Sequence, residues 1–396
     1  MSPTERSGAP PHEPGTPLIA SLRSQTNRHI RASDRTRIET LLWRSIAVIE
    51  ENQAPGGAYP ASPSFPVYRY CWFRDGSFIA DAISRAGRVE SAAAFFGWCS
   101  RVVVDRAGRV ESLLARRARG EPIPLEDFLP CRYTLDGDDA AEDWWEFQLD
   151  GYGTWLWALD RHAARRGVSL RPYADAAELT VRYLTAFWAE PCYDWWEEHP
   201  AHRHTSTLAA VHGGLAAAAG WDVLASATRD AARRTAAEIR ARVLAEGVHE
   251  GHLVKWLGGR ELDASLIACS TPFGLLAPRE PVTTATVDAL EAELVHGGVH
   301  RYAGDSYFGG GEWLLLSALV GWYYAEAGRI GDACTQLLWV ADQAEENGDL
   351  PEQVSGHLLA PDQYAPWVER WGPVATPLLW SHAMFITLAH ELGLLE

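Results

Sequence analysis

The chain has 396 residues, and its hydrophobic content of 47% is enough to bury a large core. Its formal net charge of −17 argues against nucleic acid and anionic membranes as partners, because both are bound through basic surfaces, and it suits a neutral ligand. Eighteen tryptophans favour a sugar site, since indole offers a flat apolar face, although tryptophan is also an ordinary core residue.

Residues 1–17 are rich in Pro, Gly and Ser, so we expect disorder there, and they lack the apolar stretch of a secretory signal. No run approaches 18 apolar residues, so we expect no membrane-spanning helix. The six cysteines are scattered without a C-x-x-C pair, which indicates reduced, buried thiols. We therefore expect a soluble, cytoplasmic monomer.

Helical periodicity begins at residue 36, after an N-terminal extension of residues 1–35. Residues 36–52 place Ile38 and four further aliphatic side chains on one face. Similar patterns recur along the chain at 75–86, 88–106, 110–117, 150–166, 174–189, 204–219, 221–245, 282–295, 311–327, 329–347 and 374–392. Strand signals are few and short, such as 252–256.

About a dozen helices can bury themselves in a closed double ring. The segment 312–325 is apolar nearly all round, which is typical of a helix buried on every side, whereas 228–246 carries a charged face. The pattern favours an all-α fold, an (α/α)₆ barrel over residues 36–396, with short β elements confined to loops.

Residues 194–198, Asp-Trp-Trp-Glu-Glu, place two adjacent carboxylates behind two indoles. Burial beside an indole, together with a neighbouring carboxylate, raises the pKa of one glutamate, as a general acid near neutral pH requires. The plain alternative is a helix start whose acids complement the helix dipole.

Four other loops combine aromatic and polar side chains: 67–76, 142–153, 297–314 and 348–353. In the first, Arg74 and Asp75 follow Trp72, which suits a clamp on hydroxyl groups, although an N-cap aspartate is the simpler explanation. In the last, Glu352 has no helix partner and could be a solvated loop acid. Because loops at one end of a barrel converge, we expect a pocket with indole walls and paired carboxylates, which suits hydrolysis of a glycosidic bond.

These segments resemble glycoside hydrolase family 15, the glucoamylase-like enzymes. The resemblance runs in family order through YRYCWFRDGSFIADAISRAG (68–87), FQLDGYG (147–153), CYDWWEEHPAHRHTSTLAAVHGGL (192–215), LDASLIA (262–268), GGVHRYAGDSYFGGGEWLLL (297–316) and GDLPEQ (348–353). It implies an (α/α)₆ barrel that releases glucose from non-reducing ends with inversion.

The resemblance also implies roles for individual residues. Glu197 corresponds to the general acid, Glu352 to the general base and Tyr68 to a tyrosine that assists the base. The substrate-binding candidates are Arg74, Asp75, Trp72, Trp144, Gln148, Glu198, Arg301, Tyr307 and Trp313.

Neighbouring residues point in different directions, so Glu197 and Glu198 cannot both aim at the scissile oxygen. If Arg301 pairs with Glu198, that carboxylate stays ionised and its charge helps to raise the pKa of Glu197. Glu352 must then approach from the opposite face, because inversion needs carboxyl groups about 6.5–9.5 Å apart, against about 5–5.5 Å for retention.

Many bacterial members of the family carry an N-terminal β-sandwich, whereas about 35 residues precede the helices here. A barrel-only form suits isomaltose or short isomalto-oligosaccharides. An α-1,4-acting glucoamylase, a trehalase and an inactive sugar-binding barrel remain alternatives. His199, His202 and His204, beside two glutamates, leave a zinc site open as well, although we expect neither metal nor cofactor.

Overall fold

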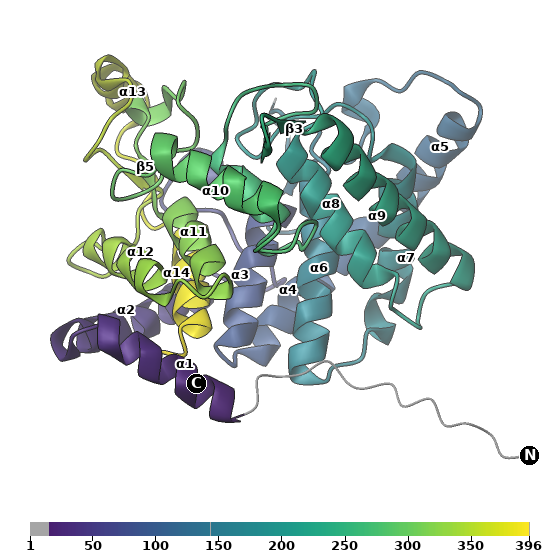
Figure 1. Ribbon diagram of the computed structural model, residues 1–396. Helices are drawn as coiled ribbons and strands as arrows, with labels where there is room; N and C mark the ends of the chain where they lie inside the picture. Colours follow the sequence, from purple (N-terminus) through teal and green to yellow (C-terminus); the bar gives the residue numbers. More distant parts are fainter. Residues whose placement is uncertain (1–15, 143, 396) are drawn as a thin grey trace, which may run out of the picture.

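The computed structural model describes residues 16–142 and 144–395, and in these the helices alternate between an outer and an inner ring (Figure 1). Six elements form the inner ring, where each contacts the next and the last contacts the first. They are α3 (Phe73–Arg85), α6 (Asp150–Arg166), α8 (Thr205–Ala218), the 3₁₀ helix η4 (Ala264–Cys269), α11 (Leu314–Glu326) and α14 (Leu379–Glu391). The (α/α)₆ barrel predicted from the sequence is confirmed.

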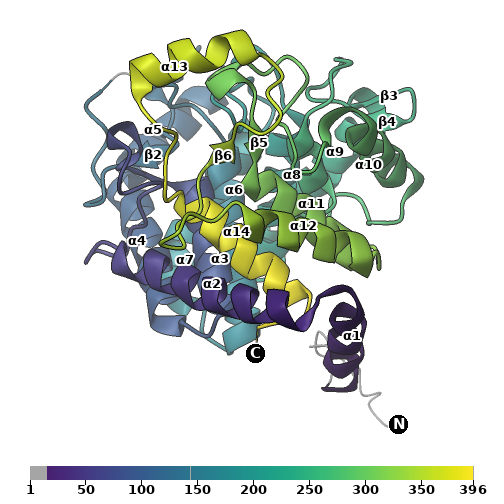
Figure 2. The same ribbon diagram turned by 90° about the vertical axis from the view of Figure 1, so that its left-hand side faces the viewer.

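The outer ring packs against these inner elements, and Figure 2 shows α14 with α2 and α12 beside it. Its members are α2 (Ala32–Glu51), α4 (Val89–Asp105), α7 (Ala174–Phe187), α9 (Ser226–Glu246), α10 (Pro281–Leu294) and α12 (Ile330–Asp342). Three helices lie outside both rings: α1 (Thr16–His29) on α12, α5 (Ala107–Ala118) on α7, and α13 (Tyr364–Trp371).

Side-chain character explains which helices are central. Every residue of α3 is buried, and so are the first eleven residues of α11, whose apolar character predicted an inner position. Between α6 and α8 the backbones approach so closely that a Cβ at Gly153 would lie 2.4 Å from the carbonyl oxygen of Ala210. Glycine is therefore required at this crossing.

Three pairs of two-residue strands decorate the barrel. They are β1 (Cys71–Trp72) with β2 (Arg132–Tyr133), β3 (Val248–His249) with β4 (His252–Leu253), and β5 (Glu312–Trp313) with β6 (Gln353–Val354), all antiparallel. Strands β1 and β5 run directly into α3 and α11, so they set the direction of the side chains at those helix starts. The remaining short 3₁₀ helices are η1 (Pro66–Tyr68), η2 (Leu125–Asp127), η3 (Arg171–Tyr173), η5 (Tyr307–Gly309) and η6 (Pro361–Gln363).

Several elements differ from the sequence-based expectations. Helix α2 begins at Ala32, and α1 occupies residues 16–29 of the expected N-terminal extension. Of residues 1–17, where we expected disorder, residues 16 and 17 begin α1, and residues 1–15 lie outside the described residues. Neither α13 nor η4 was predicted, because eight and six residues are too short for a clear helical period. Of the strand predicted at 252–256, only His252–Leu253 forms. Among the described residues, no helix combines the length and the apolar character needed to cross a bilayer.

Candidate active site

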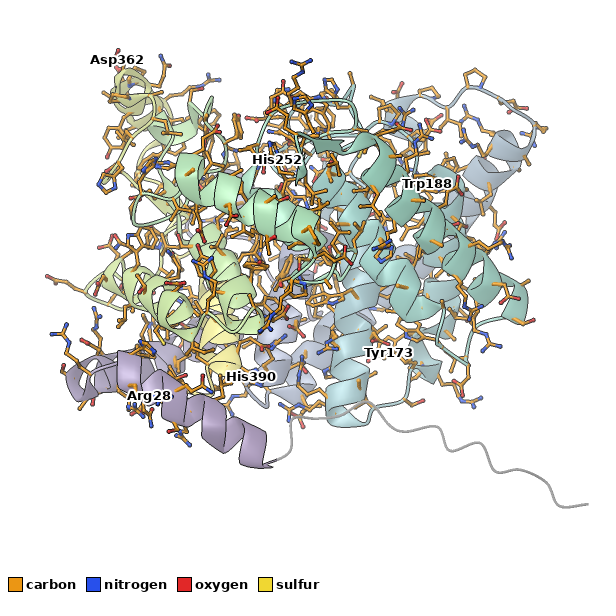
Figure 3. The ribbon with its side chains drawn as sticks, viewed as in Figure 1. Arg28, Tyr173, Trp188, His252, Asp362 and His390 are labelled. Atoms are coloured by element: carbon orange, nitrogen blue, oxygen red, sulfur yellow. The ribbon has the colours of Figure 1, made fainter. Side chains whose placement is uncertain are left out.

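A cavity of about 400 Å³ opens at the end of the barrel where the inner helices begin. Figure 3 marks the two ends of the barrel: Asp362 lies beside α13 near the cavity end, and His390 lies at the opposite end, in the last turn of α14. The residues that line the cavity come from the segments before α3, α6, α8, α11 and α14, from the segment between α12 and β6, from the first turns of α3, α11 and α14, and from α13. The convergence of loops expected from a barrel is confirmed.

Eleven of the twelve residues proposed from the sequence line this cavity: Tyr68, Trp72, Arg74, Asp75, Trp144, Glu197, Glu198, Arg301, Tyr307, Trp313 and Glu352. Gln148 does not line it. That residue is fully buried, and its Oε1 accepts a hydrogen bond of 2.6 Å from Arg74 Nη1. Its Nε2 donates to the backbone carbonyl oxygen of Trp145 at 3.4 Å, so Gln148 contacts the arginine and the backbone instead of the cavity.

Glu197 lies in a tight turn, and its backbone adopts a left-handed conformation with a φ of 65°, which is uncommon for a residue other than glycine. The carboxylate of Asp194 organises the turn by accepting the backbone N–H groups of Trp196 and Glu198 at 2.9 and 2.8 Å. Two indoles then donate to the Glu197 carboxyl group, Trp72 Nε1 to Oε1 at 2.7 Å and Trp144 Nε1 to Oε2 at 2.9 Å.

Desolvation in this indole-lined position raises the pKa of Glu197, while Arg74 and the two indole N–H groups act in the opposite direction. The sequence argument expected the charge of Glu198 to help raise this pKa. The structure assigns the rise to desolvation, and Glu198 is not among its main causes. The expectation of a raised pKa through burial beside indoles was correct, but the further contribution expected from Glu198 was wrong.

Glu352 enters the cavity from the segment between α12 and β6. It is 3% exposed, and burial raises its pKa to about 7 against the opposing effects of Tyr68 and Arg301. The Tyr68 hydroxyl lies 2.9 Å from that of Tyr307. Both tyrosines line the cavity together with the second carboxyl group.

Arg74 and Asp75 occupy the first turn of α3 and lie 3.4 Å apart, from Nε to Oδ2. Arg74 also contacts the fully buried Asp150 at 3.0 Å from Nη1 to Oδ2, and its guanidinium lies 5.5 Å from the ring centre of Trp380. Burial raises the pKa of Asp75 to about 7, although Arg74 opposes the rise. This network holds one face of the guanidinium still and presents the pair to the cavity.

Arg301 pairs with two carboxylates, of which the predicted partner is the more distant. Its Nη2 lies 3.8 Å from Glu198 Oε1, whereas Asp305 receives Nε at 2.7 Å and Nη2 at 2.5 Å. The main hydrogen-bond partner of Glu198 is Tyr302, whose hydroxyl donates to Oε2 at 2.5 Å. Tyr302 was not predicted as a site residue, because nothing in the sequence distinguishes it from its neighbour Tyr307.

A buried lysine supports the turn that carries Glu197. Lys255 is 4% exposed, and its Nζ lies 3.2 Å from Asp194 Oδ2 and 3.0 Å from Asp263 Oδ2. Asp263 in turn accepts the indole N–H of Trp196 at 2.9 Å. The cluster is a compensated set of charges, which explains why it can be buried.

The three histidines proposed as an alternative zinc site do not converge. His202 stacks on Trp256 with ring centres 4.2 Å apart, and His204 Nε2 lies 3.0 Å from the carbonyl oxygen of His199. Within the described residues, the ligand atoms close enough to share an ion belong to Asp194, Glu198 and His199, and both carboxylates already have the partners given above. The arrangement favours the hydrogen-bonded turn over a metal centre.

Several cavity residues were not proposed from the sequence as binding residues: Trp145, Trp195, Trp196, Trp367, Trp371 and Trp380. Trp195 and Trp196 stand next to the predicted acid, so their position was visible in the sequence. Trp367 and Trp371 belong to α13, whose packing over η5 is a tertiary feature without a sequence signal.

Comparison with known proteins agrees with this geometry. The model of the glycosyl hydrolases family 15 matches residues 39–339. An isomaltose glucohydrolase from Kribbella flavida is 54% identical, over 91% of this chain and 94% of its own. A solved glycosidase variant in complex with glucose is 51% identical, with a TM-score of 0.91 over 93% of this chain and all of its own.

A bacterial glucoamylase solved with acarbose shares the fold, with a TM-score of 0.68 at 19% identity over 89% of this chain and 55% of its own. The family model, which covers most of the chain, and the relative of 54% identity show that the chain belongs to glycosyl hydrolases family 15.

Proposed function

We propose that the protein is an exo-acting glucosidase that hydrolyses isomaltose and short α-glucan oligosaccharides from their non-reducing ends and releases β-glucose. The observation that carries the proposal is the presence of Glu197 and Glu352 in one tryptophan-lined cavity, although they come from loops far apart in the chain. Glycoside hydrolases typically use two carboxyl groups that flank the scissile glycosidic bond.

Glu197 is the general acid in this proposal. Desolvation raises its pKa, which favours the protonated form that a general acid needs, and the two indole N–H groups fix the orientation of the carboxyl group. When the glycosidic bond breaks, that proton passes to the leaving oxygen, so the departing sugar leaves as a neutral alcohol.

Glu352 is the general base. It takes a proton from a water molecule that attacks the anomeric carbon from the face opposite to the leaving group, which inverts the configuration. Tyr68 assists by favouring the ionised form of this carboxyl group, and Tyr307 supports the Tyr68 hydroxyl.

The cavity offers partners for a sugar that the protein itself does not use. Among the described residues, six polar atoms of the lining are buried and make no hydrogen bond: Arg74 Nε, Asp75 Oδ2, Trp195 Nε1, Trp313 Nε1, Trp367 Nε1 and Trp380 Nε1. Of these, Arg74 Nε and Asp75 Oδ2 form the ion pair described above. Buried polar atoms are normally satisfied, and sugar hydroxyls would satisfy these. We assign Asp75, with Arg74, to the non-reducing glucose.

The size of the cavity supports a short substrate. Its volume of about 400 Å³ stands at the lower end of the range of about 300–1,000 Å³ for small-molecule pockets. The relative of 54% identity is named an isomaltose glucohydrolase, which favours the α-1,6 linkage over the α-1,4 and trehalose alternatives. Both candidate catalytic carboxyl groups are in place, which disfavours an inactive sugar-binding barrel.

We also propose a cytoplasmic monomer. Six buried cysteines without a disulfide suit a reducing compartment. Gel filtration with light scattering tests the oligomeric state, and a mass near 43.7 kDa is the expected result.

The proposed function is tested by proton NMR of the protein mixed separately with isomaltose, maltose and trehalose. We expect β-glucose as the first product and the fastest release from isomaltose. Initial α-glucose would refute the assignment of acid and base, and faster release from maltose or trehalose would refute the linkage. Glu197→Gln and Glu352→Gln should each lower kcat by about 10²–10⁴, the scale of general acid–base catalysis.

A further inference from the structure

Arg132 lies directly behind the wall of the cavity that carries the two indole donors. It belongs to β2, where it pairs across the strands with Trp72 of β1. Its side chain is 1% exposed, and Nε donates to Glu146 Oε1 at 3.1 Å. Burying a guanidinium is costly, so a cation in this position calls for an explanation beyond one carboxylate at the protein surface.

Aromatic rings enclose the guanidinium. Its central carbon lies 4.2 Å from the ring centre of Tyr70 and 4.2 Å from that of Trp144, with Trp72 at 5.5 Å. A planar guanidinium stacks well on aromatic faces, and such contacts are stabilising. The cation therefore acts as a spacer between two rings.

These rings form a small cluster that is separate from the main core of the barrel. Trp72 is buried there with Ala61 and Cys131, and Tyr70 and Trp144 pack against it. Trp144 lies in the segment between β2 and α6, outside any helix or strand. Its orientation consequently depends on the stack with Arg132 more than on packing in the main core.

Two of the enclosing rings are the donors to Glu197. Trp72 and Trp144 each donate an indole N–H to a different oxygen of that carboxyl group. Arg132 does not line the cavity itself, so it can act on the substrate only through other residues.

We propose that Arg132 is a positioning residue for the general acid: by stacking between Tyr70 and Trp144, beside Trp72, it holds both indole N–H groups on the carboxyl group of Glu197. The inference rests on the proposed role of Glu197 as the acid. It assigns to Arg132 the orientation of the acid and part of the control of its protonation.

The electrostatic surroundings give the direction of the effect. Four charged groups on neighbouring elements interact electrostatically with Glu197: Arg74, Asp75, Arg132 and Glu146. Three neutral titratable groups do so as well: Tyr68, Cys131 and Tyr307. Arg132 and the two indoles lower the pKa of Glu197 against the effect of desolvation. Loss of the guanidinium should therefore raise that pKa and free the carboxyl group to rotate.

The test measures kcat, KM and the pH dependence of kcat/KM for Arg132→Met and Arg132→Lys with isomaltose as substrate. Arg132→Met should lower kcat about 10²-fold, the scale for a misplaced catalytic group, with little change in KM. Because the acid must be protonated, activity falls at high pH, and this basic limb should move to higher pH in Arg132→Met. Arg132→Lys keeps the charge without the planar stack, so its basic limb should move less while kcat still falls.

Arg329→Met is the matched control. Arg329 stacks on Tyr324 at the same distance of 4.2 Å, but it lies just beyond the C-terminal end of α11, away from the cavity. This variant should keep the kinetic parameters and pH profile of the unchanged protein. Circular dichroism and thermal unfolding establish that each variant is folded.

A folded Arg132→Met with an unmoved basic limb, or with normal kcat, would overturn the inference. If Arg132→Met does not fold, Arg132→Lys decides by the same criterion: normal kcat overturns the inference. Glu197→Gln distinguishes the role of Arg132 from the role of Glu197 as the acid. If Glu197→Gln is inactive while the Arg132 variants are normal, only the role of Arg132 is refuted. Activity in Glu197→Gln would instead remove the assignment of the acid, and this inference with it.

Discussion

Replacing Glu352 by glutamine should inactivate the protein and, at the same time, stabilise it above neutral pH. Burial raises the pKa of Glu352 from its ordinary value of 4.5 to about 7 in the folded chain. Between these two values the folded state binds more protons than the unfolded state, so the free energy of unfolding decreases as the pH rises through this window. The stabilising effect of the raised pKa is complete below pH 4.5 and lost above about pH 7.

The magnitude follows from the difference in pKa. At ~1.4 kcal/mol per pKa unit, the rise from 4.5 to about 7 corresponds to about 3 kcal/mol. Glutamine carries no titrating proton, so Glu352→Gln avoids this loss. For 396 residues the entropy of unfolding is ~0.8 kcal/mol/K, which converts 3 kcal/mol to a gain of ~4 °C in Tm.

The assay is thermal unfolding of both proteins at pH 4.5 and at pH 8. The difference in Tm between Glu352→Gln and the unchanged protein should be larger at pH 8 by ~4 °C. Glu346→Gln removes an exposed carboxylate from the same inter-helix segment and serves as the control, with no expected dependence of its Tm difference on pH. Equal Tm differences at the two pH values for Glu352→Gln would refute the claim that burial raises this pKa.

Three further predictions concern the base, the rim of the cavity and the barrel. Tyr68→Phe removes a group that lowers the pKa of Glu352, so the acidic limb of the kcat/KM profile should move to higher pH; an unmoved limb would contradict the role of Tyr68. Trp371 lines the cavity and is 44% exposed, so Trp371→Ala should raise KM for isomaltotriose more than for isomaltose, and equal effects would place it outside the sugar path. Gly153→Ala places a Cβ 2.4 Å from the carbonyl oxygen of Ala210 and should destabilise the fold by about 1–3 kcal/mol in chemical denaturation, whereas an unchanged midpoint would show that α6 and α8 can separate freely.

Much of the barrel was predictable because the residue patterns of the inner and outer helices differ. The unbroken apolar character of α11 can be satisfied only by burial on every side, and the charged face of α9 only by an outer position. The fourth inner position could not be predicted, because η4 spans six residues and its burial is imposed by α8 and α11 on either side.

The site shows the same division. The sequence by itself determined which groups meet, since Asp-Trp-Trp-Glu-Glu and Pro-Glu-Gln carry the chemistry in their residue types and the barrel brings loop ends together. It could not determine the partners inside the site. Arg301 faces two carboxylates, and the closer one, Asp305, takes the short hydrogen bonds because of the backbone geometry of one loop.

Only the tertiary structure decided the role of residues without a motif. Arg132 carries no sequence signal, because its environment consists of Tyr70 and Trp72 from the segment before α3 and of Trp144 and Glu146 from the segment before α6. Local periodicity and residue type indicate whether a side chain prefers the core or solvent, and whether it prefers an ion pair or an aromatic contact. Which distant residue becomes the partner of that side chain depends on how the helices pack against one another, and this packing forms only when the whole chain folds.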